Sequence, residues 1–200
     1  ILMKFVVLLT ILTTALLMHA KEKDSSIKKE DSQQVAEYTV VHNFKENDAS
    51  SKWVTVNDNV MGGRSKGGFV IKKDRLIFSG ATNTNGGGFS SIRTKPQNLD
   101  FQDKQGVIIK FKGDGRTYKF DARMGNSSVA HRVDFKTKAN PKDWQTVKID
   151  FASLSPSWRG MALSGRRFEL DAANIRSIGF MIYDKKDGPF ELKVDWIKAY

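Results

Sequence analysis

Short runs of alternating apolar and polar residues, separated by Gly, Asn and Asp, begin at Tyr38 and continue to the end of the chain. In residues 107–112 and 190–196 the apolar side chains recur at every second position or run continuously. Such patterns are typical of strands that bury one or both faces. Strands are therefore expected at residues 38–44, 52–56, 68–72, 76–79, 89–93, 107–112, 118–123, 132–137, 145–150, 175–183 and 190–199.

Helical periodicity is nearly absent, apart from one short turn expected at Asp171-Ala-Ala-Asn174 with Asp171 as its cap. Many short strands with regular turn signals predict an all-β, antiparallel sandwich or barrel. Residues 184–188, Asp-Lys-Lys-Asp-Gly, are interpreted as the tip of a hairpin. No repeat of fixed period is present, which argues against propellers and solenoids.

The N-terminal part has a different composition. Residues 1–20 contain a basic residue followed by an apolar run that is short for a membrane helix, and they are predicted to be a secretory signal peptide. An uncleaved anchor is the alternative; after cleavage the protein would not be transmembrane. Residues 21–37 are mostly charged and polar, so a disordered linker is expected there. The domain itself is predicted to span residues 38–200.

The chain has 200 residues, no cysteine and a formal net charge of +11. The absence of cysteine excludes disulfides, thiolate chemistry and cysteine zinc sites. The basic residues are scattered among acidic ones and no nucleic-acid-recognition motif is present, so nucleic acid is not the expected partner. An anionic lipid or an acidic glycan would also suit this charge, but most of it is interpreted as a solvated surface.

One polar turn follows a predicted strand, in the stretch Trp53-Val-Thr-Val-Asn-Asp-Asn-Val-Met-Gly-Gly-Arg-Ser65. Gly62 and Gly63 permit backbone angles that other residues avoid. A simple turn does not require Asp, Arg and Ser together. We expect an ion pair between Asp58 and Arg64 to brace this loop. An ordinary hairpin with charged decoration is the alternative.

Further runs follow in order: Phe78-Ser-Gly80, Asn85-Gly-Gly-Gly-Phe-Ser-Ser-Ile-Arg93, Gly113-Asp-Gly-Arg-Thr-Tyr118, Trp158-Arg-Gly160, Ile178-Gly-Phe-Met-Ile182 and Gly188-Pro-Phe-Glu-Leu192. Together with the Asp-Asn-Val-Met-Gly-Gly-Arg-Ser run, this set resembles the complex I intermediate-associated protein 30 family over residues 38–200. The resemblance implies a jelly-roll sandwich of the galactose-binding-domain type. It also implies a non-enzymatic binding module that resembles an assembly factor or chaperone, with a protein partner.

The motif positions fall into two expected groups. Those expected to bind a partner are Asn57, Asp58, Arg64, Ser65, Arg93, Arg116, Trp158 and Arg159. Those expected to hold the fold are Trp53, Met61, Gly62, Gly63, Gly86, Gly87, Gly88, Phe89, Gly113, Asp114, Gly115, Gly179 and Phe180. The sequence leaves open which motif residues are structural and which contact a partner.

Catalytic chemistry is not expected. His42 and His131 have no neighbours in a metal-ligand pattern, and no serine lies in a Gly-x-Ser-x-Gly elbow. A pair of loop carboxylates would be needed for glycoside hydrolysis, but Asp114 and Asp184 are interpreted as ordinary turn residues. No cofactor is expected, although Asn57-Asp58-Asn59 offers oxygen ligands for a structural calcium.

Two interpretations of the binding role therefore stand. The first is an exported assembly-factor-like module with a protein partner, which predicts a contiguous exposed apolar patch. The second is a secreted carbohydrate-binding module for an acidic glycan, with a groove lined by arginine and by Trp158. Trp53 and Trp196 are assigned to the core because they lie in strand patterns. The leader places the protein in the cell envelope or outside the cell; the family resemblance gives mitochondria as the alternative.

Overall fold

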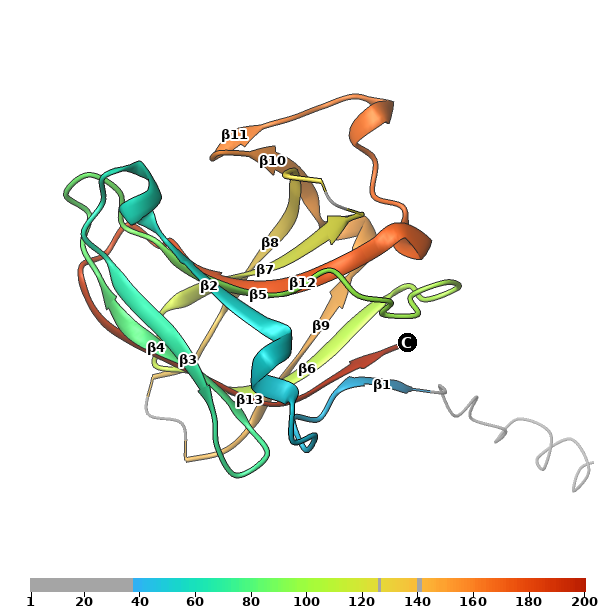
Figure 1. Ribbon diagram of the computed structural model, residues 1–200, viewed down its shortest axis with the longest axis horizontal. Helices are drawn as coiled ribbons and strands as arrows, with labels where there is room; N and C mark the ends of the chain where they lie inside the picture. Colours follow the sequence, from blue (N-terminus) through green and yellow to red (C-terminus); the bar gives the residue numbers. More distant parts are fainter. Residues whose placement is uncertain (1–37, 126, 140–141) are drawn as a thin grey trace, which may run out of the picture. The chain divides into compact units, whose positions relative to one another are not determined.

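The computed structural model describes residues 38–125, 127–139 and 142–200. In these residues the strands pair to form two antiparallel sheets (Figure 1). Tyr38–Tyr200 form one compact unit. The predicted signal peptide and linker lie outside the described residues. Within the described ranges, no helix has the length and apolar character needed to cross a membrane.

The six-stranded sheet contains, in spatial order, β3 (Lys66–Ile71), β4 (Leu76–Thr82), β13 (Gly188–Ala199), β6 (Gly106–Lys112) and β9 (Gln145–Asp150), and β1 (Thr39–His42) also pairs with β13. The seven-stranded sheet contains β11 (Met161–Ala162), β10 (Ser155–Trp158), β8 (Ala130–Lys136), β7 (Thr117–Met124), β12 (Ile175–Ile182), β5 (Ser90–Thr94) and β2 (Trp53–Asn57). Most spatial neighbours are distant in sequence, as in a jelly roll. The fold is an antiparallel jelly-roll sandwich of the galactose-binding-domain-like type.

Short 3-10 helices connect some of the strands: η1 (Ala49–Lys52), η2 (Asp58–Met61), η3 (Phe151–Ser153), η4 (Arg166–Phe168) and η5 (Ala172–Asn174). The turn expected after Asp171 is confirmed as η5. The Asp171 side chain accepts a hydrogen bond from the Ala173 amide at 3.1 Å, which caps this turn.

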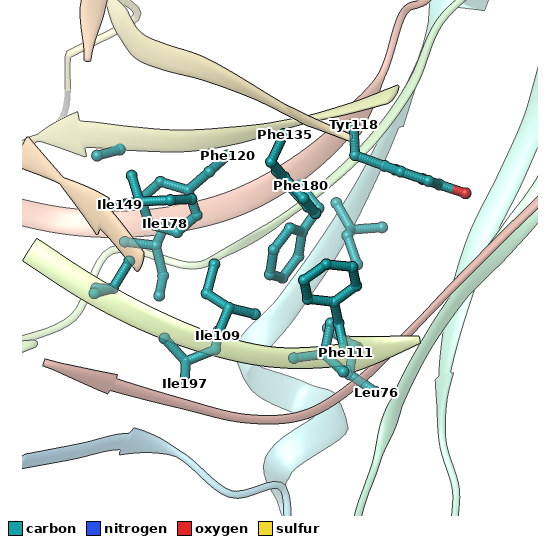
Figure 2. Close-up of a cluster of buried hydrophobic side chains, with 14 of the residues drawn as sticks. Leu76, Ile109, Phe111, Tyr118, Phe120, Phe135, Ile149, Ile178, Phe180 and Ile197 are labelled. Carbon is teal, nitrogen blue, oxygen red and sulfur yellow. The ribbon is translucent and has the colours of Figure 1, made fainter. Parts of the chain in front are cut away.

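The hydrophobic core lies between the two sheets, where the inward side chains of both alternate with outward ones (Figure 2). In β12 the buried residues Ile178 and Phe180 face this core, and in β7 Tyr118 and Phe120 do the same. The intervening residues of these strands lie on the outer face. The period-two pattern of the sequence thus fixes which side chains of the seven-stranded sheet are available outside the core.

All the expected strands are present, but β10 and β11 were not anticipated. Their sequences, Ser-Pro-Ser-Trp and Met-Ala, are short and contain no β-branched residue. Pairing with β8 makes β10 a strand, with Ser155 opposite Arg132. These two strands extend the seven-stranded sheet beyond β8 and rise from its end (Figure 1).

The prediction of a hairpin tip at residues 184–188 is wrong. This loop joins β12, in the seven-stranded sheet, to β13, in the six-stranded sheet, and the two strands do not pair with each other. β12 is paired on both sides with β5 and β7 instead. The Asp and Gly residues that signal a turn do not specify whether the following strand returns to the same sheet.

The assignment of Trp196 to the core is also wrong, whereas Trp53 is buried as expected. The pairing of β13 with β6 shifts register between Val194 and Trp196. This β-bulge interrupts the alternation, because a bulge adds one residue to one strand. Trp196 is only partly buried and packs under Lys198, whose ammonium lies 4.7 Å from the ring centroid.

A pH dependence of stability arises from His42 at the end of β1. Burial, together with a smaller effect of the Lys52 charge and against the opposing charge of Glu46, lowers the pKa of His42 from 6.5 to about 4. The unfolded chain therefore binds more protons than the folded one between these values. We expect the free energy of unfolding to fall by about 2–3 kcal/mol as pH decreases from 6.5 towards 4.

Urea unfolding followed at several pH values measures this slope. In the variant His42→Gln the fall between pH 6.5 and 5 should be clearly smaller. An equal slope in both proteins would show that His42 does not cause it.

Candidate functional site

The family-type motif forms two loops joined by the buried carboxylate of Asp58. Its Oδ1 accepts a hydrogen bond from the Ser65 amide at 2.9 Å, and its Oδ2 accepts one from the Ser65 hydroxyl at 2.6 Å. The amides of Gly88 and Phe89 also donate to Oδ2, at 2.7 and 3.2 Å. Asp58 thus connects the loop that follows β2 to the loop that precedes β5.

Two glycines leave the space that this carboxylate fills. A Cβ on Gly63 would lie 2.2 Å from Asp58 Cγ, and a Cβ on Gly87 would lie 2.6 Å from Asp58 Oδ2. Side chains at either position would displace the carboxylate. The need for glycine here comes from close packing.

The prediction of an ion pair between Asp58 and Arg64 is wrong. Arg64 is exposed, and it forms no ion pair with Asp58 among the described residues. Asp58 points into the domain, where burial would raise its pKa; the hydrogen bonds from Ser65, Gly88 and Phe89 outweigh this and hold its pKa below 3.8. No group of three or more potential metal ligands occurs in the described ranges, and calcium at this loop stays a prediction.

Arg116 is directed into the domain, where it joins several loops. It donates to both carboxylate oxygens of Asp184, to the carbonyls of Gly188 and Pro189 at 3.1 Å, and to the carbonyl of Lys186 at 2.7 Å. Its side chain is 10% exposed and that of Asp184 is 6% exposed. Arg116 therefore holds the crossover from β12 to β13.

A groove of about 1460 Å³ crosses the outer face of the seven-stranded sheet. We define this outer-face groove by its lining residues on β2, β5, β12, β7, β8 and β10, together with the loops at its two ends. The sheet curves so that β10 and β11 rise at one end and the η2 loop rises at the other (Figure 1). The floor is made by the outward residues of the central strands.

Arginine residues dominate the floor of the outer-face groove. Strand pairing aligns Arg93 of β5, Gly179 of β12, Asp121 of β7 and Arg132 of β8 in one row across the sheet. The Nε and Nη2 atoms of Arg132 donate to Asp121 at 2.6 and 3.2 Å. Arg123, two residues after Asp121 on the same face, has its Nη2 3.5 Å from that carboxylate.

Burial lowers the pKa of Arg123, and the charges of Arg93 and Arg132 lower it further, while Asp121 opposes the shift. These three arginines and the single carboxylate carry a net charge of +2. The centre of the outer-face groove is therefore electropositive.

An apolar wall lies beside this basic floor. Val54 and Val56 of β2 line it with Met181 of β12, and Tyr183 follows at the end of β12. Met61, at the end of η2, is 63% exposed and lines the same end of the groove. The loops held by Asp58 thus add an exposed, unbranched apolar side chain to this wall.

Trp158 and Arg159 line the opposite end. Trp158 is 37% exposed, and the Arg159 guanidinium carbon lies 4.8 Å from its ring centroid. Arg159 has a φ of +49°, in the left-handed region that few non-glycine residues adopt. One face of the indole is covered by Arg159.

The structure separates the eight predicted binding residues into three groups. Arg93, Trp158 and Arg159 line the outer-face groove. Asn57, Asp58, Ser65 and Arg116 make hydrogen bonds within the domain, and Arg64 is exposed but does not line the groove. The binding role of these residues stays a prediction.

Sequence reasoning missed Arg123, Arg132 and Met181. The signal for Arg123 was present, because Tyr118-Lys-Phe-Asp-Ala-Arg123 alternates and places Lys119, Asp121 and Arg123 on one face. Their proximity to Arg93 and Arg132 was not accessible, since it depends on which strands are neighbours.

The fold and this groove define a class of protein: a jelly-roll β-sandwich with a ligand-sized groove on one sheet. The structure is similar to the family 11 carbohydrate-binding module of a Clostridium thermocellum cellulosomal cellulase, with a TM-score of 0.60 and 18% identity over 82% of this chain and 94% of that one. It is also similar to part of an agarase, with a TM-score of 0.56 and 11% identity over 81% of this chain and 24% of that one. At these identities the likeness shows the fold.

The family is given by the sequence match. Residues 42–194 match the model of the family described as complex I intermediate-associated protein 30, and the chain belongs to this family. It is 26% identical to the mouse mitochondrial protein of that name over 184 residues, covering 80% of this chain and 56% of the mouse one. The probable Caenorhabditis elegans counterpart is 30% identical over 102 residues, covering 47% of this chain and 28% of the worm protein. The chain thus spans about half the length of the mouse relative.

Proposed function

We propose that this chain is a non-enzymatic binding module of the assembly-factor kind, and that the outer-face groove holds a segment of a protein partner. The observation that carries the proposal is the combination of an apolar wall with a basic floor in one groove. Protein interfaces combine apolar contacts at their centre with polar groups that fix orientation. The name of the mouse relative, which associates it with an intermediate of complex I, supports a protein partner.

The two carboxylates of the groove region are engaged by basic residues. Asp121 is paired with Arg132 and Arg123, and Asp134 is paired with Lys119. An acid–base pair for glycoside hydrolysis needs carboxylates that can reach substrate and exchange protons. These contacts support a role in binding.

Photo-crosslinking on the full chain tests this function. A photoreactive amino acid at Met61 should form crosslinks to a polypeptide in cell extract. Val70, 56% exposed on β3 of the other sheet, is the matched control. Protease-sensitive adducts from position 61 but not from position 70 support the proposal. The same adducts from both positions, or none from position 61, contradict it.

Met61→Glu should weaken capture of that crosslinked partner about tenfold or more, because it places a charge on the apolar wall. Val70→Glu should leave capture unchanged. Both variants should keep the melting temperature of the parent within a few degrees, since both side chains are exposed. A loss of capture in Val70→Glu as well would show that the groove is not the contact surface.

An acidic glycan is the second candidate, favoured by Trp158 at the rim and by the charge of the floor. Oligogalacturonate and heparin are suitable probes, with binding measured by calorimetry at low and high salt. Binding that falls as salt rises and is lost in Trp158→Ala would favour the glycan. Protein crosslinks from position 61 without glycan binding would favour the polypeptide.

An exported form is part of the proposal and rests on the composition of residues 1–20, whereas the mouse and worm relatives are named as mitochondrial. Sequencing the N-terminus of the mature protein tests it. Cleavage after Ala20, with the product in the cell envelope or medium, supports export. Recovery from mitochondria contradicts it.

A further inference from the structure

The outer-face groove has an excess of guanidinium groups at its centre. Arg132 is engaged by Asp121 through two hydrogen bonds, and Arg123 approaches the same carboxylate with one nitrogen. Arg93 has no carboxylate within 4.0 Å in the described part of the chain. One acidic residue therefore faces three permanent positive charges.

Arg123 has donor capacity that the described residues do not use. Its side chain is 13% exposed. Its Nη1 donates to the Ser128 carbonyl at 2.8 Å, but its buried Nε has no hydrogen-bond partner among the described residues. A buried charged donor without a partner costs free energy, because the protein does not replace its hydration.

Gly179 lies between Arg93 and Asp121 in this row and allows β5 and β12 to approach closely. A Cβ at this position would lie 2.2 Å from the Ile92 carbonyl and 2.8 Å from Arg93 Cα. Gly179 is itself buried, and its close contact with Arg93 holds that residue in the same row as Asp121.

We propose that Arg93, Arg123 and Arg132 form an anion-binding subsite that takes an aspartate or glutamate carboxylate of the partner polypeptide. The inference rests on the proposed function, because it assumes that a protein segment lies in this groove. A carboxylate accepts the paired N–H groups of guanidinium in a planar geometry and offsets the local excess of positive charge. The neighbouring Met181 and Met61 would contact apolar side chains beside that acidic residue.

The partner segment thus combines an acidic residue with apolar neighbours. The apolar wall of Val54 and Val56 lies next to the subsite, since Val54 is opposite Arg93 in the pairing of β2 with β5. This arrangement favours a polypeptide as the ligand, because its side chains can be apolar. The rings of a glycan carry hydroxyl groups on most carbons, and these groups are less suited to an apolar wall.

Titration of the full chain with two synthetic peptides tests the subsite. In one peptide Glu alternates with Leu, and in the other Gln replaces every Glu. The Glu peptide should bind at least about tenfold more tightly, and its affinity should fall as salt rises. The NMR signal of Arg123 Nε–H should shift on addition of the Glu peptide. Equal binding of the two peptides, or binding of neither, overturns the proposal.

Arg93→Met separates a binding role from a structural one. It should weaken binding of the Glu peptide about tenfold, while the melting temperature stays the same or rises, because one of three repelling charges is removed. Arg75→Met, in the turn between β3 and β4 of the other sheet, is the control and should leave binding unchanged. A lower melting temperature with unchanged peptide binding in Arg93→Met would overturn the proposal.

The failure of this inference can be distinguished from failure of the proposed function. If Arg93→Met captures the crosslinked partner as well as the parent does, and Met61→Glu does not, the groove binds a protein without an anion subsite. If both variants capture it normally, the groove itself is not the contact surface. Binding of oligogalacturonate but not of the Glu peptide would assign the arginines to a glycan and also overturn the inference.

Discussion

Asp58→Ala is expected to lower the free energy of unfolding by about 3–5 kcal/mol. The carboxylate is fully buried and accepts hydrogen bonds from the Ser65 amide and hydroxyl and from two further amides. Its removal leaves these donors without an acceptor and opens a cavity between Gly63 and Gly87. Chemical denaturation measures the change.

Arg64→Ala is the matched control, since Arg64 is exposed and makes no ion pair with Asp58 in the described part of the chain. It should change stability by less than about 0.5 kcal/mol. Equal losses in both variants would restore the ion-pair explanation. A loss below about 1 kcal/mol in Asp58→Ala would show that the loops do not depend on this carboxylate.

The contribution of Asp58 should also depend on pH. Its pKa in the folded protein is below 3.8, so the stabilisation is fully present above that value and is lost as pH falls through the lower folded pKa. The stability difference between the parent and Asp58→Ala should therefore shrink below about pH 4. A constant difference down to pH 2 would contradict the assignment.

Arg116→Met is expected to lower the free energy of unfolding by about 3–4 kcal/mol. The change leaves the Asp184 carboxylate buried without its partner and removes donors from the carbonyls of Lys186 and Gly188. Burial raises the pKa of Asp184, and Arg116 outweighs this and keeps it below 3.8. In the variant Asp184 should titrate at higher pH, which NMR of its carboxyl carbon would detect.

Arg75→Met provides the comparison, because the pair of Arg75 with Asp195 is more exposed. Its loss should cost less than about 1 kcal/mol, since solvent screens exposed ion pairs. The same cost for both substitutions would mean that burial of Arg116 adds nothing.

Much of the fold was predictable because alternation is a local property. In β7 the alternation agrees with the structure, because Tyr118 and Phe120 face the core and their neighbours lie on the outer face. The bulge beside Trp196 was not predictable, since it arises from pairing with β6. For the same reason, the turn residues after Asp184 could not predict which sheet the following strand joins.

By itself, the sequence determined the sandwich class, the inward and outward faces of most strands and the membership of the family. Only the tertiary structure decided that Asp58 joins two loops and that Arg116 is internal, because both depend on partners distant in the chain. The arginine cluster likewise comes from residues on three strands, Arg93, Arg123 and Arg132. Local patterns fix the direction of a side chain in its own strand, whereas its neighbours across the sheet are set by long-range pairing.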